Sequence, residues 1–330
     1  MTTLDRRHVV LAGAALLAGS AQAQTPARKR PALVAIPGMG SPEGPSSRAI
    51  AHLKARLAEL GWREPQDIRY EVRWARGQAA LLPALVQELL ALQPDVVWTA
   101  GAATALAARA ATSTVPIVFS AAADPVALGL ARSLARPGGN ATGLATQMNE
   151  YMPKSLQLLQ RLLPGLARVG FLAHFDDAST RLVLADLQKA AAQLRVSVVP
   201  APLQPGDALA DQFVLMLRER IDAVIVNGDL ATAVRAAAIN ELLARHRLPA
   251  LLPARSLLGA AGVMSFGIAI DDLYRRSAEY IDRILRGAKA AELPIEQPTR
   301  FELVINQRAA RSLGLVVPAA LLLQADEVIE

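Results

Sequence analysis

Two stretches that match each other decide the fold, "PDVVWTAGAATALAARAATSTVPIVFS" (94–120) and "IDAVIVNGDLATAVRAAAINELLARHRLPALLP" (221–253). In each, an apolar strand-like run ends in glycine and small residues. A helix-like run follows, and an X-Pro pair precedes the next strand-like run. Such alternation is typical of a parallel sheet covered by helices on both faces. Because the pattern occurs twice, the sequence predicts an α/β protein with two Rossmann-like, doubly wound lobes.

The alternation continues outward from both stretches. In the first half, the sequence predicts strands over 34–36, 67–74, 96–99 and 117–120, and helices over 50–60, 81–92 and 104–111. In the second half, it predicts strands over 169–173, 196–199, 223–226 and 248–252, and helices over 180–193, 207–219 and 232–245.

The chain is expected to cross between the lobes several times. "NATGLATQ" (140–147) and "AGVMSFG" (261–267) are glycine-led strands at which one lobe ends. A helix over 271–286 returns to the first lobe, and the C-terminal segment completes the second. The expected limits are 31–145 plus 271–297 for lobe I and 146–270 plus 298–330 for lobe II. Several crossings form a multi-strand hinge with a cleft between the lobes.

The N-terminus reads as an export signal. "DRRHVVLAGAALLAGSAQAQ" (5–24) has paired arginines, a short apolar region and an A-x-A motif. We expect a signal peptide over 1–23, cleaved after Ala23, and a linker over 24–30. A twin-arginine and a general secretory signal both remain open, and a buried N-terminal helix is the alternative. The expected location is the periplasm.

Composition excludes several classes of function. The 330 residues include no cysteine, so thiol nucleophiles, cysteine-ligated zinc and disulfides are excluded. The net charge is +6, but the basic residues are scattered singly, which disfavours nucleic-acid binding. The histidines lie far apart in sequence, so no metal site is expected.

The loop "VAIPGMGSPEGPS" (34–46) resembles a phosphate cradle, because a strand, a glycine loop and a helix start follow one another. It lacks the lysine of a nucleotide-binding loop, and Glu43 would repel phosphate. No Gly-x-Ser-x-Gly motif or other catalytic constellation occurs. We therefore expect no cofactor and no enzymatic activity, and interpret the loop as one lip of a binding cleft.

Ligands of open parallel sheets lie outside the carboxyl ends of the strands, so the candidate site residues come from those loops. Helix N-termini there can hold a carboxylate, or their hydroxyl side chains can simply cap the helices. Asp124 can bind an ammonium group or cap a helix, and Arg255 can clamp a carboxylate or lie on the surface. The candidate ligand-binding residues are Gly40, Ser41, Gly101, Ala102, Thr104, Ser120, Asp124, Gln147, His174, Phe175, Asn227, Asp229 and Arg255.

Nearly the whole chain resembles a family of ABC-transporter substrate-binding proteins, the bacterial group that includes tryptophan-binding members. The resemblance rests on "RWARGQAALLPALVQELL", "AATSTVPIVFSAAADPVALGLARSLARPGGNATGLATQ", "AAGVMSFG" and "PTRFELVINQRAARSLGLVVPAALLLQADEVIE". It implies the type I periplasmic-binding fold with a three-stranded hinge. It also implies capture of a small-molecule ligand, delivery to a membrane permease with its ATPase subunit, no chemistry, and a monomer that meets the membrane only through the permease.

The match to the family is uneven. "AADPVALGL" keeps the family's Asp-Pro, which favours Asp124 as a site residue, and "GAATALAA" keeps Thr104. The second lobe departs: His174 and Phe175 stand where the family often has Asn-Pro, and near Arg255 the family's usual tyrosine and glutamate are missing. The expected solute is an amino acid or a small organic or aromatic acid.

Two other classes of function stay open. A two-lobe exported enzyme, such as a racemase or lyase, would need an acid–base pair across the cleft, for which His174 and Asp124 are available. A ligand-dependent partner of a membrane sensor is the other alternative.

Overall fold

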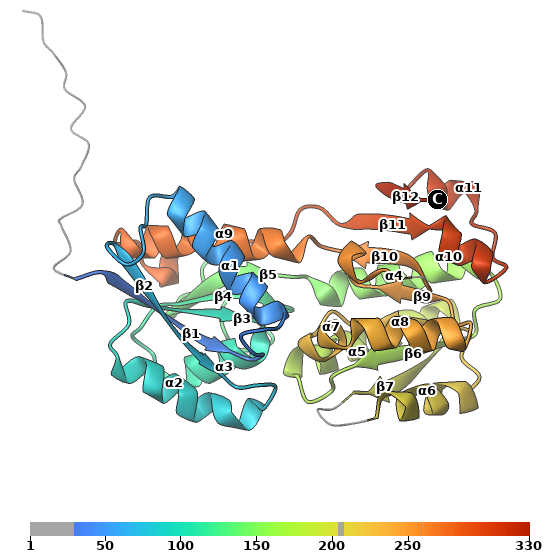
Figure 1. Ribbon diagram of the computed structural model, residues 1–330, viewed down its shortest axis with the longest axis horizontal. Coiled ribbons are helices and arrows are strands. Elements are labelled where there is room, and N and C mark those ends of the chain that lie inside the picture. The colour runs from blue at the N-terminus through green and yellow to red at the C-terminus, as the bar shows by residue number, and fades with distance from the viewer. Residues whose placement is uncertain (1–29, 204–207, 260) are drawn as a thin grey trace, which may run out of the picture.

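The computed structural model describes residues 30–203, 208–259 and 261–330. The predicted signal peptide and its cleavage site lie outside the described residues. The predicted fold class is confirmed, because the chain forms two separate sheets, each covered by helices (Figure 1).

The first lobe is built on a five-stranded sheet in which every pair is parallel. Its order is β2 (Ile68–Trp74), β1 (Ala32–Gly38), β3 (Val96–Ala100), β4 (Ile117–Ala122) and β5 (Ala141–Ala145). Its helices are α1 (Pro45–Glu59), α2 (Leu82–Ala91), α3 (Ala102–Ala111) and α9 (Ile270–Leu285), with short 3₁₀ turns η1 (Ala79–Leu81) and η3 (Ala290–Glu292).

The second lobe is built on a seven-stranded sheet. Its order is β12 (Glu327–Ile329), β11 (Glu302–Asn306), β10 (Gly262–Gly267), β9 (Ala250–Leu252), β8 (Ala223–Val226), β6 (Arg168–Ala173) and β7 (Ser197–Pro202). β11 runs antiparallel to β10, and the other pairs are parallel. Its helices are α4 (Met148–Leu162), α5 (Ala178–Leu194), α6 (Leu209–Arg218), α7 (Leu230–Val234), α8 (Ala236–Arg245), α10 (Gln307–Ser312) and α11 (Ala319–Leu322), with the 3₁₀ turn η2 (Arg255–Leu257).

Each sheet buries an apolar cluster on both faces, as a doubly wound fold requires. In the first lobe, α1 and α9 pack together over one face and α2 and α3 cover the other (Figure 1). In the second lobe, α4, α5 and α10 cover one face, and α6 and α8 cover the other. The continuous burial of β1, whose seven residues are all buried, follows from helices on both sides.

The chain passes between the sheets three times: from β5 to α4, from β10 to α9, and from η3 to β11. α9 therefore belongs to the first lobe, where it packs on α1, although it follows β10 of the second sheet. We propose the lobe limits 31–145 plus 271–297 and 146–270 plus 298–330, which fall within or beside these crossings.

Between residues 146 and 270, two helices differ from the sequence prediction. α4 has no counterpart in it, although Leu156 and Leu159 of this helix are fully buried in the core of the second lobe. Pro153 lies inside α4 and removes one hydrogen bond donor, a loss that this packing offsets. The helix predicted over 232–245 is interrupted at Arg235, which ends α7 and begins α8.

Candidate functional site

Two adjoining cavities lie in the cleft between the lobes. The larger, about 500 Å³, is lined by the loop 39–45, by His174, Asp176 and Asp177, and by α7, and we call it the rim chamber. The smaller, about 290 Å³, is lined by the start of α3, the start of α5 and crossing residues such as Thr146 and Ile268. We call it the hinge chamber. The residues that line both are Met39, Pro45, Ala103, Asp177, Asp229 and Leu230.

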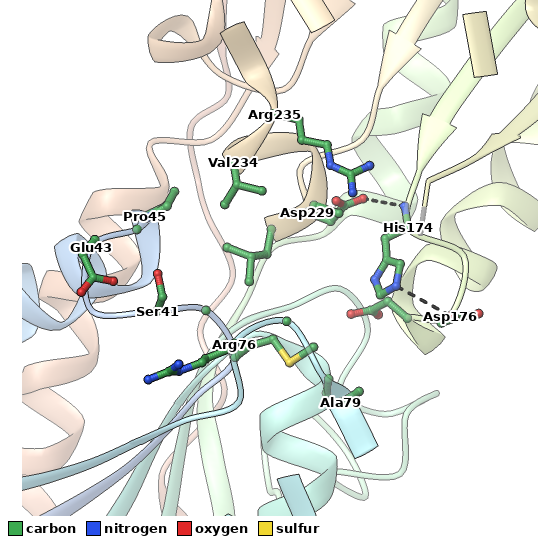
Figure 2. Close-up of a pocket in the computed structure, with 18 of the residues that line it drawn as sticks. Ser41, Glu43, Pro45, Arg76, Ala79, His174, Asp176, Asp229, Val234 and Arg235 are labelled. Atoms are coloured by element: carbon green, nitrogen blue, oxygen red, sulfur yellow. Dashed lines mark hydrogen bonds and ion pairs between the residues drawn. The ribbon is translucent and has the colours of Figure 1, made fainter. Parts of the chain in front are cut away.

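Figure 2 shows that the rim chamber is enclosed from both lobes. Ser41, Glu43 and Pro45 of the first lobe stand on one side, and Val234 and Arg235 of the second lobe stand opposite. Because a change in the angle between the lobes would separate these walls, the cavity depends on the hinge.

The loop 39–45 of the first lobe is held in place by backbone hydrogen bonds. The amides of Arg76 and Gly77 donate to the carbonyls of Gly40 and Met39 at 2.9 and 2.7 Å. Gly44 is the N-cap of α1 and no side chain caps the helix, while the Ser47 hydroxyl donates to the Gly44 carbonyl at 2.8 Å. No hydroxyl side chain therefore caps the start of α1, although the sequence allowed this role. The loop before the helix is held by backbone hydrogen bonds instead.

The start of α3 forms the first-lobe wall of the hinge chamber. Gly101 caps this helix with φ +103°, a conformation that glycine adopts without strain, and its amide donates to the Ser120 carbonyl at 2.8 Å. No side chain caps α3, and the Thr104 hydroxyl donates back to the Gly101 carbonyl. The helix dipole therefore presents partial positive charge and backbone amides at this wall.

A hydrogen-bonded polar network forms the second-lobe wall. The side-chain amide of Asn227 donates to Asp229 Oδ2 at 2.9 Å and to Thr180 Oγ1 at 3.2 Å. Asp229 Oδ2 also accepts from the His174 amide at 3.0 Å, and Oδ1 accepts from the Thr232 amide at 2.9 Å in a capping box. Asp177 caps α5 by accepting from the Ser179 amide at 2.7 Å.

Burial perturbs the titration of three groups in the hinge chamber. It raises the pKa of Asp177, and the nearby charge of Asp229 adds to the rise. It also raises the pKa of Tyr151, and that of Tyr274 to about 12. Both tyrosines are therefore neutral at physiological pH, whereas a buried Asp177 carboxylate calls for a compensating positive charge.

Three lining side chains of the hinge chamber carry buried polar atoms without a hydrogen bond partner among the described residues. They are Thr146 Oγ1, Ser179 Oγ and Asn227 Oδ1. Leaving such an atom unpaired costs about 1–3 kcal/mol. Few buried polar atoms in folded proteins stay unpaired, so these three are exceptions at the wall of the hinge chamber.

The structure brings together most of the site residues predicted from the sequence. Gly40, Ser41 and His174 line the rim chamber, and Asp229 lines both chambers. Four further predicted residues line only the hinge chamber: Gly101, Ala102, Thr104 and Asn227.

The other predicted site residues lie outside the lining of both chambers, and their contacts explain why. Ser120 is fully buried and accepts a hydrogen bond from Trp98 Nε1 at 3.2 Å. Asp124 accepts from the amides of Val126 and Ala127, both at 3.0 Å, so it is engaged as a cap.

Phe175, Gln147 and Arg255 are placed by structural roles as well. Phe175 packs edge-on against Phe171 in the core, with ring centroids 6.0 Å apart. Gln147 begins α4 in the left-handed conformation, with φ +54°. Arg255 forms a two-point ion pair with Glu327, in which Nη2 lies 2.6 Å from Oε1.

Sequence reasoning missed several lining residues. Thr146, Tyr151 and Tyr274 come from the crossings and the helices that follow them, where no strand end marks a ligand site. Arg76 and Arg235 line the rim chamber, and nothing in the sequence distinguishes them from the other basic residues. The sequence does offer a signal at Ser179, which lies in the first turn of α5, two residues after the aspartate that caps this helix.

Among the described residues, no three or more histidine, cysteine, aspartate or glutamate side chains are arranged to hold a metal ion. No helix in this part of the chain has the length and apolar character needed to cross a membrane.

Residues 43–329 match the family model described as ABC transporter substrate binding protein. A tyrosine-binding protein of Clostridioides difficile (strain R20291) is 20% identical over 259 residues, which are 78% of this chain and 74% of that protein.

Among solved structures, a conserved domain protein from Vibrio cholerae superposes with a TM-score of 0.82 at 24% identity. An ABC domain from Streptococcus pneumonia in complex with L-Trp superposes with a TM-score of 0.81 at 22% identity. Each alignment covers 91% of this chain and 100% of the other.

Proposed function

This chain belongs to the family of ABC transporter substrate binding proteins, and from that premise we propose that it captures a small solute in the inter-lobe cleft and delivers it to a membrane permease. The permease would work with a cytoplasmic ATPase subunit. The single observation that supports this proposal best is the hinge chamber, which lies between two lobes and carries unpaired polar atoms.

The proposed solute is an amino acid or a small organic or aromatic acid. The uncapped start of α3 offers backbone amides to a carboxylate, and the helix dipole favours the negative charge. Tyr151 and Tyr274 add aromatic surface to the same chamber. Relatives whose names state tyrosine binding or a complex with L-Trp support this class of solute.

We propose that the protein works outside the cytoplasm as an exported monomer, with its signal peptide removed. Solute binding would favour the closed arrangement of the lobes, because both walls of the cleft then contact the solute. The permease would recognise that arrangement. A membrane sensor in place of the permease is the second candidate partner that the sequence left open.

A catalytic role has little support at this site. The acid–base pair considered for an enzyme was His174 and Asp124, and Asp124 lies outside both chambers. Its carboxylate accepts two backbone amides instead.

Isothermal titration calorimetry tests the proposed function. Protein refolded to remove bound solute is titrated with the twenty L-amino acids and with small organic and aromatic acids. We expect at least one to bind with a dissociation constant in the micromolar range or below. Absence of binding across the whole panel would overturn the proposal.

The Ser41→Trp variant locates the site. Ser41 lines the rim chamber, so an indole there would occupy the space of the solute or hold the lobes apart. We expect at least about a tenfold loss of affinity, equivalent to about 1.4 kcal/mol, with unchanged thermal stability. Unchanged affinity would remove the loop 39–45 from the site.

A further inference from the structure

We propose that the edge of the second-lobe sheet that lies away from the cleft binds an anionic phospholipid surface. The residues that form this surface are Arg168, Arg195, Arg218, Arg220 and Arg247, and we call them the arginine edge. All five lie outside the lining of both chambers, so the proposal goes beyond solute capture. It adds a direct contact with the membrane to the contact through the permease.

The topology of the second sheet gathers arginines that are far apart in the sequence. The loops after β6 and β8 line the cleft, so the starts of these parallel strands lie at the opposite edge. Arg168 begins β6, and Arg195, Arg220 and Arg247 lie in the turns that lead into β7, β8 and β9. Because these four strands are neighbours in the sheet, with about 4.8 Å between adjacent strands, one arginine stands at the start of each across about 14 Å.

Three of these arginines occupy the same backbone position in repeated units. Arg195, Arg220 and Arg247 have φ values of +57°, +53° and +52°, the left-handed conformation after a helix, where glycine is most common. The helix dipole favours a cation at this position. In the first lobe, however, the corresponding turns carry the uncharged Gly61 and Gln93, with φ of +96° and +54°. The row of charges is therefore a property of the second lobe and not of the repeated turn.

The arginine edge has few negative partners. Arg195, Arg218 and Arg220 form no ion pair with any residue that the structure describes. Arg247 donates from Nη2 to the Ser312 carbonyl at 3.2 Å. These four arginines are all exposed, so their charge is available to an external anion.

Two acidic residues lie on the same turns and leave a positive excess. Glu219 lies 3.7 Å from Arg168, and Asp222 accepts from the Arg168 amide at 2.8 Å. The five arginines therefore exceed the carboxylates of these turns by three charges. Helix α10, whose end Arg247 contacts, adds the exposed Arg308 and Arg311 beside the row.

A bilayer with anionic headgroups fits this surface. Arginine binds phosphate through two parallel N–H donors, and a row across four strands can meet several headgroups at once. Leu215 and Leu217 of α6 are 40% and 37% exposed beside Arg218, and apolar side chains flanked by arginine suit the interfacial region of a bilayer. Single-stranded nucleic acid is bound by stacking on aromatic side chains as well as by charge, and residues 218–222 and 245–247 include no Phe, Tyr or Trp.

Binding through the arginine edge leaves the cleft open to solution, because the two lie at opposite ends of the strands. It also concentrates the protein on the membrane that holds the permease of the proposed function, which raises the rate at which the two meet.

Cosedimentation with lipid vesicles tests the proposal. The exported protein is mixed with vesicles of phosphatidylcholine, alone or with about one third phosphatidylglycerol, at about 0.1 M and about 0.5 M NaCl. At the lower salt concentration, we expect the anionic vesicles to bind at least about tenfold more strongly than the neutral ones, and we expect this binding to be lost at the higher.

Equal binding to the two kinds of vesicle, or none to the anionic ones, would overturn the inference and leave the proposed function standing. Binding of single-stranded DNA or polyglutamate without binding of anionic vesicles would overturn it as well and would indicate a different partner.

A combined variant, Arg195→Asn, Arg220→Asn and Arg247→Asn, assigns the binding to the arginine edge. Asparagine adopts the left-handed conformation more readily than most residues, so the three turns should still form. We expect partitioning onto anionic vesicles to fall at least about 50-fold, since each arginine near such a surface contributes about fivefold. Melting curves and the affinity for solute should stay unchanged.

The matched control, Arg69→Gln, Arg132→Gln and Arg136→Gln, removes the same charge from exposed positions of the first lobe. We expect its partitioning within about threefold of the parent, because salt screens charges far from the membrane. Equal losses in both variants would overturn the inference, since net charge alone would then explain the binding. If the combined edge variant does not fold, Arg220→Asn decides, with an expected loss of about fivefold, and unchanged partitioning there would overturn the inference.

Discussion

Identical side chains at similar places in the sequence have different surroundings in this protein. Asp124 and Asp177 both follow a strand and precede a helical turn, and both accept backbone amides as caps. Asp177 also lines both chambers and is desolvated there, which raises its pKa, whereas Asp124 lies outside them. The difference comes from what packs around each carboxylate, so residue type and local spacing did not distinguish them.

A single glycine in the first sheet should prove essential to stability. Gly143 of β5 has φ +147°, and a Cβ built on it would lie 1.9 Å from the Phe119 carbonyl oxygen of β4. We expect Gly143→Ala to lower the free energy of unfolding by about 2–4 kcal/mol, through overpacking and backbone strain together. Urea denaturation measures this change.

Gly165→Ala is the matched control for that experiment. Gly165 is exposed, and a Cβ there would meet no atom within 4 Å. Its substitution should leave stability unchanged or raise it by up to about 1 kcal/mol, because the unfolded chain loses conformational freedom. Equal effects at the two glycines would contradict the close approach of β5 to β4.

Helices and strands were predicted well where the apolar pattern is regular, and less well where packing overrides local preference. The strand over 223–226 lies where it was predicted, because its buried run is bounded by polar residues. α4 was missed because a proline stands within it, and its stability comes from the core of the second lobe. The break at Arg235 was missed because the capping box of Asp229 starts a separate short helix, α7.

The returning helix α9 is tied to the first lobe by ion pairs as well as apolar contacts. Arg275 bonds Glu59 of α1, and Arg276 bonds Glu296 through two hydrogen bonds of 2.9 and 3.0 Å. These contacts join segments far apart in sequence and hold one of the three crossings in place. The pair with Arg276 lowers the pKa of Glu296 below its usual value of 4.5.

The lowered pKa of Glu296 predicts how stability depends on pH. A carboxyl group whose pKa is lower in the folded state stabilises the protein above its unfolded pKa and loses that contribution as the pH falls through its folded pKa. We expect Glu296→Gln to be less stable than the parent at pH 7 and to approach it below about pH 4.5. Thermal unfolding from pH 3 to 7 measures the difference.

Glu292→Gln is the control for the pH experiment. Glu292 is exposed and lies 3.7 Å from the exposed Lys289. A pair of this kind contributes at most about 1 kcal/mol, and often nothing measurable. The stability of this variant should follow that of the parent across the range. A constant difference between Glu296→Gln and the parent at every pH would refute the role of the Glu296 charge.

At the scale of the molecule, the two lobes and three crossings predict closure on the solute. Solute that binds both walls of the cleft stabilises the closed arrangement, which is more compact. We expect the best ligand of the calorimetric panel, at saturation, to reduce the radius of gyration measured by small-angle X-ray scattering. At 100 times its dissociation constant it should also raise stability by about 2.7 kcal/mol.

Ser41→Trp at the same ligand concentration is the control for closure, and it should show a smaller change in radius. An unchanged radius for the parent protein at saturation would contradict closure and would indicate that the cleft is already shaped for its solute.

The sequence by itself determined the two doubly wound lobes, the crossing segments and the loops at the edge of the cleft. It did so because apolar periodicity, glycine and proline act over a few neighbouring residues. Which side chains line the hinge chamber depends on the tertiary structure. Asn227, Asp177 and Thr146 lie far apart in the chain, and the packing of the two lobes brings them together at the wall of the hinge chamber. The local sequence pattern therefore predicts the helices and strands, whereas the arrangement of the two lobes determines which polar groups meet at the site.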